Sequence, residues 1–280
     1  MKTAAAGGRG GIQWTLFDQL EDLDFADDLA LLSHGRAQMQ DGTTHLETVS
    51  AGVGLKIGKR KAELIGTNTT ADSPVMIGGE PVREVESFVC LGSIIDGRGG
   101  SGRDVKAMIG KARGAFVMLK KIWSSKEISQ RTKLRIFNSN VKSVLLYGCE
   151  TWRTTETMLE KIQIFVNTCL RRILNIRWTD RVRNEDLWQR ADQKPAAQQI
   201  LRRKWGWIGH TLRKPASSIT RQPLKWNPQG KRKRGRPRNS WRRDTEAEIN
   251  RQGKTWIERA AQDRVGWRIV VDGLCSPGGS

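Results

Sequence analysis

Cysteine and histidine are scarce in this sequence. Its four cysteines lie far apart, form no CxxC pair and have no histidine near them in the chain. This spacing argues against a disulfide framework and against a zinc site, and it favours a reducing compartment. The three histidines are scattered as well, so the sequence lacks the pattern of a Cys/His nucleophilic site and we do not expect hydrolase chemistry.

Long apolar runs are also missing. The longest, such as Val144–Tyr147, fall far short of the roughly 20 residues that a membrane-spanning helix needs. The Gly-rich start of the chain lacks the apolar core of a signal peptide. These absences predict a soluble protein of the nucleus or cytoplasm that has no membrane partner.

Acidic residues are absent from one long stretch. From Gln193 through Arg243 there is no Asp or Glu, whereas Lys and Arg together number sixteen. The whole chain has 49 basic and 29 acidic residues and a formal net charge of +20. A field of this sign attracts polyanions, first among them the phosphate backbones of RNA and DNA. A basic solvated surface without a partner is the alternative.

Tryptophans are interleaved with the basic residues of this stretch. They are Trp205, Trp207, Trp226 and Trp241. Indole rings can stack on unpaired bases, contributing about 1–3 kcal/mol for each stacked base. Packing of Trp205 and Trp207 against a helical core would explain them equally well. Prolines recur in the same stretch, so we expect that much of it is not continuous helix.

The first hundred residues have the pattern of short strands. Apolar positions between Trp14 and Ser33 frame Asp27-Asp28, which predicts a β-hairpin whose turn presents carboxylates. A helix-like spacing follows over residues 36–53. Further short strands are expected at residues 55–58, 62–65, 75–77 and 87–95, and a Gly-rich linker is expected at residues 97–102.

From Arg103 onward the apolar period changes to 3.6, which predicts three helices in succession. Ser129 can cap the second helix, and Thr154 or Thr155 can cap the third. Their apolar stripes are typical of an ordinary core and not of a cofactor site. Helical patterns return near residues 244–249 and 256–267.

The sharpest local signal is Phe25-Ala26-Asp27-Asp28 in its apolar frame. Two adjacent carboxylates at a rigid turn can hold Mg²⁺ ions, which activate the attacking oxygen and neutralise the leaving group in nucleotidyl transfer. The small side chain of Ala26 would let a substrate strand approach. A solvated turn without a function explains such a pair equally well when it stands alone.

The stretch Leu23-Asp24-Phe25-Ala26-Asp27-Asp28-Leu29-Ala30-Leu31-Leu32-Ser33 closely resembles the catalytic hairpin of reverse transcriptases from non-LTR (LINE-type) retrotransposons. The resemblance continues in order over about residues 14–250. Its later segments are Gly54–Ile57 with Lys61, Phe88–Ile95, Leu146–Trp152, Arg202–His210, and Gly230–Pro237 with Trp241. This ordered series is far more specific than any one of its members.

The resemblance implies roles for two groups of residues. Asp27 would be the principal ligand of catalytic Mg²⁺, with Asp28 beside it. Lys61 would assist the nucleoside triphosphate or the leaving pyrophosphate. The primer terminus would be supported by three residues of the later strand pair: Phe88, Leu91 and Gly92.

The chain departs from the family in two ways. Gly58 and Ala62 stand where the family commonly has a polar residue and Thr, which puts the role of Lys61 in doubt. The family also needs another catalytic Asp from an earlier strand, together with fingers that bind template and nucleotide. Only 26 residues precede Asp27. We therefore expect no polymerase activity from this chain alone, and Mg²⁺ only if an N-terminal part is supplied.

The basic tract supplies the residues that we expect to bind RNA and DNA. They are Arg202, Arg203, Lys204, Trp205, Lys231, Arg232, Lys233, Arg234, Arg236 and Arg238. Arg234-Gly235-Arg236-Pro237 matches the core of an AT-hook, whose arginines favour a narrow minor groove. Lys231–Arg234 would equally serve as a nuclear localisation signal that binds import receptors.

The expected fold class is α+β: a partial reverse-transcriptase palm hairpin and strands, then an all-helical thumb-like region and a basic, partly disordered tail. The expected segments are a disordered Gly-rich N-terminus (1–12), the partial palm (13–100), the thumb-like region (101–192), the basic tract (193–243), and C-terminal helices and tail (244–280). The function expected is that of a retroelement reverse-transcriptase fragment. The alternatives are a non-enzymatic nucleic-acid-binding protein of retrotransposon origin, and a decayed copy without a cellular role.

Overall fold

The structure, a computed structural model, describes residues 11–13, 19–67, 73–97, 99–224, 241–250 and 258–275. The chain divides into two units. Unit 1 comprises Met1–Gly99 and Gln222–Arg234, and unit 2 comprises Gly100–Arg221 and Gly235–Ser280. Residues 193–221, which we expected within a separate basic tract, therefore belong to the same unit as the preceding helices.

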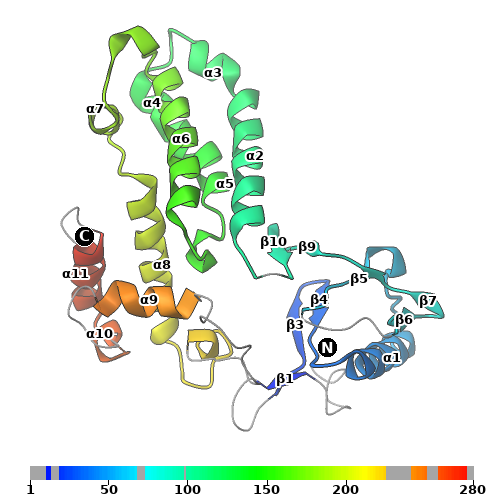
Figure 1. Ribbon diagram of the computed structural model, residues 1–280. Coiled ribbons are helices and arrows are strands. Elements are labelled where there is room, and N and C mark those ends of the chain that lie inside the picture. The colour runs from blue at the N-terminus through cyan, green and yellow to red at the C-terminus, as the bar shows by residue number, and fades with distance from the viewer. Residues whose placement is uncertain are drawn as a thin grey trace. The chain divides into compact units, whose positions relative to one another are not determined.

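Unit 1 contains the described strands, one long helix and two short helical turns (Figure 1). The strands are β1 (Ile12–Gln13), β2 (Gln19–Leu20), β3 (Asp22–Phe25), β4 (Asp28–Leu31), β5 (Glu63–Leu64), β6 (Met76–Ile77), β7 (Glu80–Pro81), β8 (Arg83–Glu84), β9 (Ser87–Cys90) and β10 (Ser93–Asp96). The helical elements are α1 (Arg36–Gly52), η1 (Lys59–Lys61) and η5 (Gln222–Leu224).

The described strands pair only two by two. The pairs β1–β2, β3–β4, β6–β7 and β9–β10 are antiparallel, and β5–β8 is parallel. Local alternation and tight turns explain the hairpins, and the hairpin expected around Asp27 is confirmed as β3–β4. Part of the N-terminus expected to be disordered is also placed, because Ile12 lies in β1.

The strand expected at residues 55–58 is wrong. The backbone N–H of Leu55 donates to Ser50 O at 2.8 Å and so closes the end of α1, with Gly54 at φ 77. A positive φ after a helix is favoured by glycine and satisfies the last helical carbonyls. The chain then passes into the short helix η1, so its backbone N–H groups are not used in a sheet.

Apolar packing in unit 1 is thin. The large side chains of the β3–β4 hairpin are exposed, with Phe25 at 66%, Leu23 at 49% and Leu29 at 37%. Buried apolar residues of this unit, among them Leu20, Val75 and Ile77, are few in comparison with unit 2. This hairpin is therefore covered less completely than a strand inside a larger sheet would be.

All the regular elements among the described residues of unit 2 are helices (Figure 1). Its elements are α2 (Gly102–Met118), α3 (Lys120–Ser124), α4 (Gln130–Ile136), η2 (Phe137–Lys142), α5 (Ser143–Leu145), η3 (Cys149–Thr151), α6 (Glu156–Ile173), η4 (Trp178–Asp180), α7 (Asn184–Arg190), α8 (Ala196–Leu212), α9 (Trp241–Asn250), α10 (Glu258–Gln262) and α11 (Arg264–Leu274). The three helices expected after Arg103 are confirmed as α2, the run from α4 through α5, and α6. The middle of that run, η2, is a π-helix.

Two expected helix caps are confirmed. The Ser129 side chain accepts a hydrogen bond from the Thr132 backbone N at 3.2 Å, and the Thr155 side chain accepts one from Met158 N at 3.4 Å. Each satisfies a backbone N–H that a helix leaves unpaired at its start, which stabilises the helix by about 1 kcal/mol.

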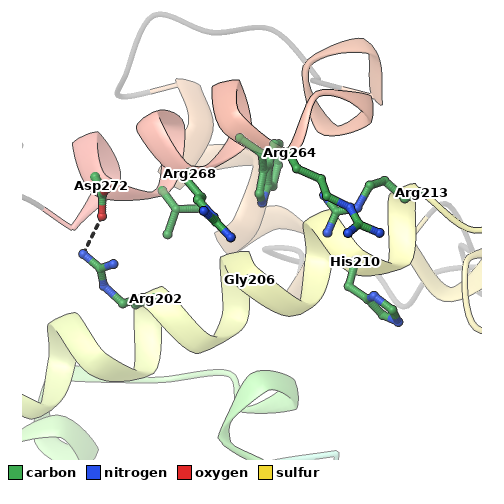
Figure 2. Close-up of a pocket in the computed structure, with 9 residues that line it drawn as sticks. Arg202, Gly206, His210, Arg213, Arg264, Arg268 and Asp272 are labelled. Carbon is green, nitrogen blue, oxygen red and sulfur yellow. Dashed lines mark ion pairs between the residues drawn. The ribbon is translucent and has the colours of Figure 1, made fainter.

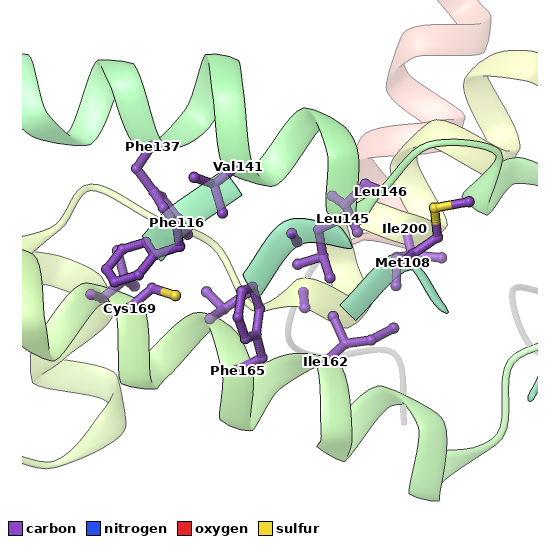
Figure 3. Packing of buried hydrophobic residues seen from close by; sticks show 14 of the residues in the cluster. Met108, Phe116, Phe137, Val141, Leu145, Leu146, Ile162, Phe165, Cys169 and Ile200 are labelled. Atoms are coloured by element: carbon purple, nitrogen blue, oxygen red, sulfur yellow. The ribbon is translucent and has the colours of Figure 1, made fainter. Parts of the chain in front are cut away.

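One continuous apolar core joins the helices from α2 through α8. Met108, Phe116, Phe137, Ile162 and Leu170 are all at most 7% exposed within it. Figure 3 shows the apolar side chains of these helices packing against one another, including side chains from helices far apart in sequence. Burial of each large apolar side chain contributes about 1.5–3 kcal/mol, so this core is the main source of stability in unit 2.

The α8 helix ends before the prolines that were expected to break the basic tract, and the described residues beyond it, 213–224, form only turns and the short helix η5, as expected. The α8 helix runs for 17 residues without interruption because Pro195 stands at its N-cap and Pro215 follows its end. Proline is tolerated at both kinds of position, since neither needs a backbone N–H inside the helix.

None of the helices in the described part of the chain is long and apolar enough to span a membrane.

Candidate functional site

The turn of the β3–β4 hairpin presents the two candidate catalytic carboxylates. Phe25 pairs with Asp28, so the connecting residues are Ala26 and Asp27. Ala26 has φ 56, in the left-handed region that costs a non-glycine residue about 1–2 kcal/mol. Such strain at a turn is typical of functional sites and makes the turn a candidate on structural grounds.

Both carboxylates are exposed to solvent. Asp27 lies at the turn and Asp28 is the first residue of β4, on the same face as Phe25. In the described residues no group of three His, Cys, Asp or Glu side chains is close enough to hold a metal ion. Two adjacent carboxylates can contribute ligands to one Mg²⁺, which also takes water and phosphate oxygens, but they supply only part of the ligand set of a catalytic metal pair.

Lys61 is exposed at the end of η1. Among the described residues no hydrogen bond or ion pair joins it to Asp27 or Asp28, so the structure does not bring these three residues into one hydrogen-bonded group. Its neighbour Lys59 is engaged elsewhere, where its Nζ donates to Gly78 O at 3.0 Å.

The residues expected to support a primer terminus lie in the β9–β10 hairpin. Phe88 is half-buried in β9, and Leu91 and Gly92 form the turn. Both turn residues have positive φ, 48 for Leu91 and 84 for Gly92. Two consecutive positive φ values match the twist of the flanking strands, but leucine is an uncommon residue at this position. Leu91 is 45% exposed, so this turn too presents a strained residue to solvent.

The basic residues expected at the start of α8 have different surroundings. Arg202 is exposed and forms an ion pair with Asp272 at 2.6 Å. Arg203 Nη1 donates to Leu146 O at 3.1 Å.

Lys204 and Trp205 are buried, at 4% and 0% exposure. Lys204 Nζ donates to Glu248 Oε1 at 3.0 Å, and Trp205 Nε1 donates to Glu248 Oε2 at 3.1 Å. Lys204 Nζ also lies 5.3 Å from the centroid of the Trp241 ring. The expectation that Lys204 and Trp205 contact nucleic acid directly is therefore corrected. The Lys204 ammonium and the Trp205 indole N–H, which would have bound nucleic acid, already donate hydrogen bonds to Glu248.

Six of the expected nucleic-acid-binding residues lie outside the described residues. They are Lys231, Arg232, Lys233, Arg234, Arg236 and Arg238. The AT-hook and nuclear localisation hypotheses fall on the same segment and stay predictions.

One buried cation could not be anticipated from the sequence. Lys142, in η2, is 6% exposed, and its Nζ donates to Gln193 Oε1. Burial, and next the nearby charge of Arg203, lower the pKa of Lys142 from 10.5 to about 8. Lys142 is the last residue of the π-helix η2, and no periodic pattern of residue types predicts a π-helix.

Sequence reasoning also missed Arg264 and Arg268 on α11, because we confined the basic tract to residues 193–243. Both arginines are exposed and lie one turn apart on the same helical face. That i, i+4 spacing on an amphipathic helix was a signal that could have found them.

Comparisons with known proteins identify a distant relative. An uncharacterized transposon-derived protein of Caenorhabditis elegans is 25% identical over 267 residues, which cover 90% of this chain and 95% of the relative. Residues 115–147 match a family described as a domain of unknown function (DUF6451). No solved structure matches the chain. The chain is thus a distant homologue of a transposon-derived protein over nearly the whole length of both.

Proposed function

We propose that the protein is a nucleic-acid-binding protein derived from a retroelement reverse transcriptase, and that this chain does not synthesise DNA by itself. The observation that carries the proposal is the match to a transposon-derived protein along 90% of the chain. The ordered resemblance to LINE-type reverse transcriptases, which covers about the same span, supplies the class of element.

The geometry of the two hairpins supports this class. Asp27 and Asp28 are exposed at a turn strained at Ala26, and Leu91 sits strained at the tip of the second hairpin. A turn without a function would be expected to carry glycine or asparagine at a positive φ. Alanine and leucine at these positions favour turns whose side chains meet a substrate.

Charge supports binding to nucleic acid. A formal net charge of +20 attracts phosphate backbones, and each neutralised phosphate releases condensed counterions. Binding is therefore expected to weaken steeply as salt concentration rises.

The ligand set supports the proposal that the chain does not polymerise by itself. The turn offers two carboxylates, and the described residues hold no third His, Cys, Asp or Glu with which they could form a metal site. A metal held from one side only would bind weakly, so we expect no template-directed synthesis.

A primer-extension assay on the purified chain with Mg²⁺ tests the inactivity. No product is expected. Mg²⁺-dependent extension by the wild type that Asp27→Ala removes would show that the chain is a complete polymerase.

The reverse-transcriptase assignment needs a second experiment. The chain would be joined to an N-terminal half of a LINE-type reverse transcriptase that carries the fingers and the further aspartate. Synthesis that depends on Asp27 is expected. If the fusion folds and binds primer–template but extends nothing, the non-enzymatic alternative is preferred.

That alternative is a nucleic-acid-binding protein in which the hairpin has no role. It predicts that Asp27→Ala leaves binding unchanged and that neutralising Arg234 and Arg236 weakens it. The same binding measurements on the chain alone establish whether nucleic acid is the ligand at all.

A further inference from the structure

Helices α8 and α11 pack side by side in opposite directions. The Trp267 indole N–H donates to Trp205 O at 3.0 Å in the middle of the contact. Arg202, in the first half of α8, pairs with Asp272, near the end of α11. Past the end of α8, Arg213 Nη1 donates to Ala261 O at 3.0 Å. A cavity of about 500 Å³ lies between the two helices.

The rim of this cavity is strongly basic (Figure 2). Its lining residues are Arg202, Gly206, His210, Arg213, Arg264, Trp267, Arg268, Val271 and Asp272. We call them the α8–α11 groove. Four arginines face a single carboxylate there, so the groove carries a net positive charge that an anion would neutralise.

Two of the four arginines are already engaged and two are not. Asp272 neutralises Arg202, and Arg213 uses one nitrogen on Ala261 O. Arg264 and Arg268 are exposed and have no ion-pair partner among the residues that the structure describes. Figure 2 shows both side chains extending from α11 toward α8. Guanidinium groups held in this way present paired N–H donors that match phosphate oxygens.

The shape of the groove favours a strand over a single phosphate. From Arg202 to Arg213 the chain advances eleven residues, about 16 Å at roughly 1.5 Å per residue. Trp267 is buried, so the groove offers no exposed indole for stacking on a base, and His210 is its single exposed ring. Contact would be with the backbone and insensitive to base sequence.

We infer that the α8–α11 groove binds the phosphodiester backbone of a single nucleic-acid strand, with Arg264 and Arg268 as its principal phosphate ligands. The inference rests on the proposed nucleic-acid binding and names a site for it in unit 2. Two of the four arginines of this site, Arg264 and Arg268, lie outside the basic tract at residues 193–243.

The test is a fluorescence-anisotropy titration of the full chain against a labelled single strand of mixed sequence, at a series of KCl concentrations. The variant is Arg264→Gln with Arg268→Gln. Removing one phosphate-binding arginine lowers the slope of log K against log salt by about 0.7, so the double variant should lower it by about 1.4. At about 0.1 M salt the same relation weakens binding roughly 25-fold.

Arg131 and Arg135 on α4 provide a matched control. They are exposed, belong to the same unit and have the same i, i+4 spacing, but they lie outside the groove. Arg131→Gln with Arg135→Gln removes the same charge and should weaken binding by about twofold or less, because exposed charges that contact no phosphate are screened by salt.

A gain of affinity separates binding from mere structural support. Asp272→Asn removes the carboxylate that lines the groove and frees Arg202 for a further phosphate. Binding should tighten about fivefold at about 0.1 M salt. A groove arginine with only a structural role would not produce this gain.

Equal losses in the two double variants would overturn the inference, because binding would then follow total charge and not the groove. The proposed nucleic-acid binding would survive that result, whereas a wild type that binds no strand at all would remove both. Preference for duplex, or for vesicles containing anionic lipid, would also overturn it. RNA and DNA strands run in parallel identify the source of the backbone.

Discussion

Two glycines of α8, three residues apart, are expected to respond to the same substitution in opposite directions. A Cβ added at Gly206 would meet no atom within 4 Å. A Cβ added at Gly209 would overlap Trp267 Nε1 and lie 2.5 Å from Trp267 Cε2. Gly209 therefore allows the close approach of α11, whereas Gly206 does not contribute to it.

The magnitudes follow from these surroundings. Replacing an exposed helical glycine by alanine stabilises a helix by about 0.5–1 kcal/mol, and Gly206→Ala should gain that amount. Gly209→Ala gains the same helix propensity but must displace Trp267, which is 4% exposed. Overpacking costs about 1–3 kcal/mol. Loss of the hydrogen bond to Trp205 O leaves a buried N–H unsatisfied at a further cost of about 1–3 kcal/mol. The net loss in the free energy of unfolding should be about 1–5 kcal/mol.

Urea unfolding followed by intrinsic tryptophan fluorescence measures both changes. Every tryptophan except Trp14 and Trp226 belongs to unit 2, so the signal reports the unit that contains α8 and α11. If Gly209→Ala unfolds at the same urea concentration as the wild type, or if Gly206→Ala is the less stable of the two, then α11 does not pack on α8 as described. The α8–α11 groove would lose its walls in that case.

Two further predictions concern buried titratable groups. The lowered pKa of Lys142 means that the unfolded chain binds more protons between about pH 8 and 10.5, so stability rises with pH across that window. Urea unfolding at both ends of the window would measure the free energy of unfolding of the wild type and of Lys142→Met. Raising the pH should stabilise the wild type relative to the variant by up to about 3 kcal/mol, at about 1.4 kcal/mol per pKa unit. No shift would mean that Lys142 is solvated. In the native protein a thiol reagent should label Cys90 first, because it is the most accessible of the four cysteines, whereas burial raises the pKa of Cys149 and of Cys169 to about 12. Rapid labelling of all four thiols before denaturation would contradict the buried placements.

The elements that the sequence predicted well are those specified by neighbours in the chain. The β3–β4 hairpin follows from alternation around a turn, and the caps at Ser129 and Thr155 follow from a hydroxyl placed before an apolar helical stripe. All three involve partners within a few residues. Sequence patterns predict such contacts because the geometry of a single turn determines which neighbouring residues meet.

The expectation that failed at Lys204 and Trp205 depends on a distant partner. Lys204 and Trp205 have the residue types of a basic, aromatic surface, but Glu248 lies 44 and 43 residues further along the chain and binds both. The carboxylate of Glu248 on α9 thus binds both Lys204 and Trp205 in the interior, although their local sequence predicts an exposed pair. The i, i+4 spacing of Arg264 and Arg268 is a local signal, but their proximity to Arg202 and Arg213 depends on the packing of α11 on α8 and could not be predicted from neighbours in the chain.

The two units differ in a way that bears on which function could persist. The candidate carboxylates stand on a hairpin of unit 1 whose Phe25 is 66% exposed, so little apolar burial supports their geometry. The α8–α11 groove stands on helices of unit 2, where Trp205 and Ile208 are fully buried and the neighbouring core is continuous. Because stability grows with the apolar area buried, unit 2 should keep its binding surface under changes that abolish the geometry of the hairpin. Destabilising changes are therefore expected to abolish the geometry at Asp27 before they remove the proposed nucleic-acid binding through Arg264 and Arg268.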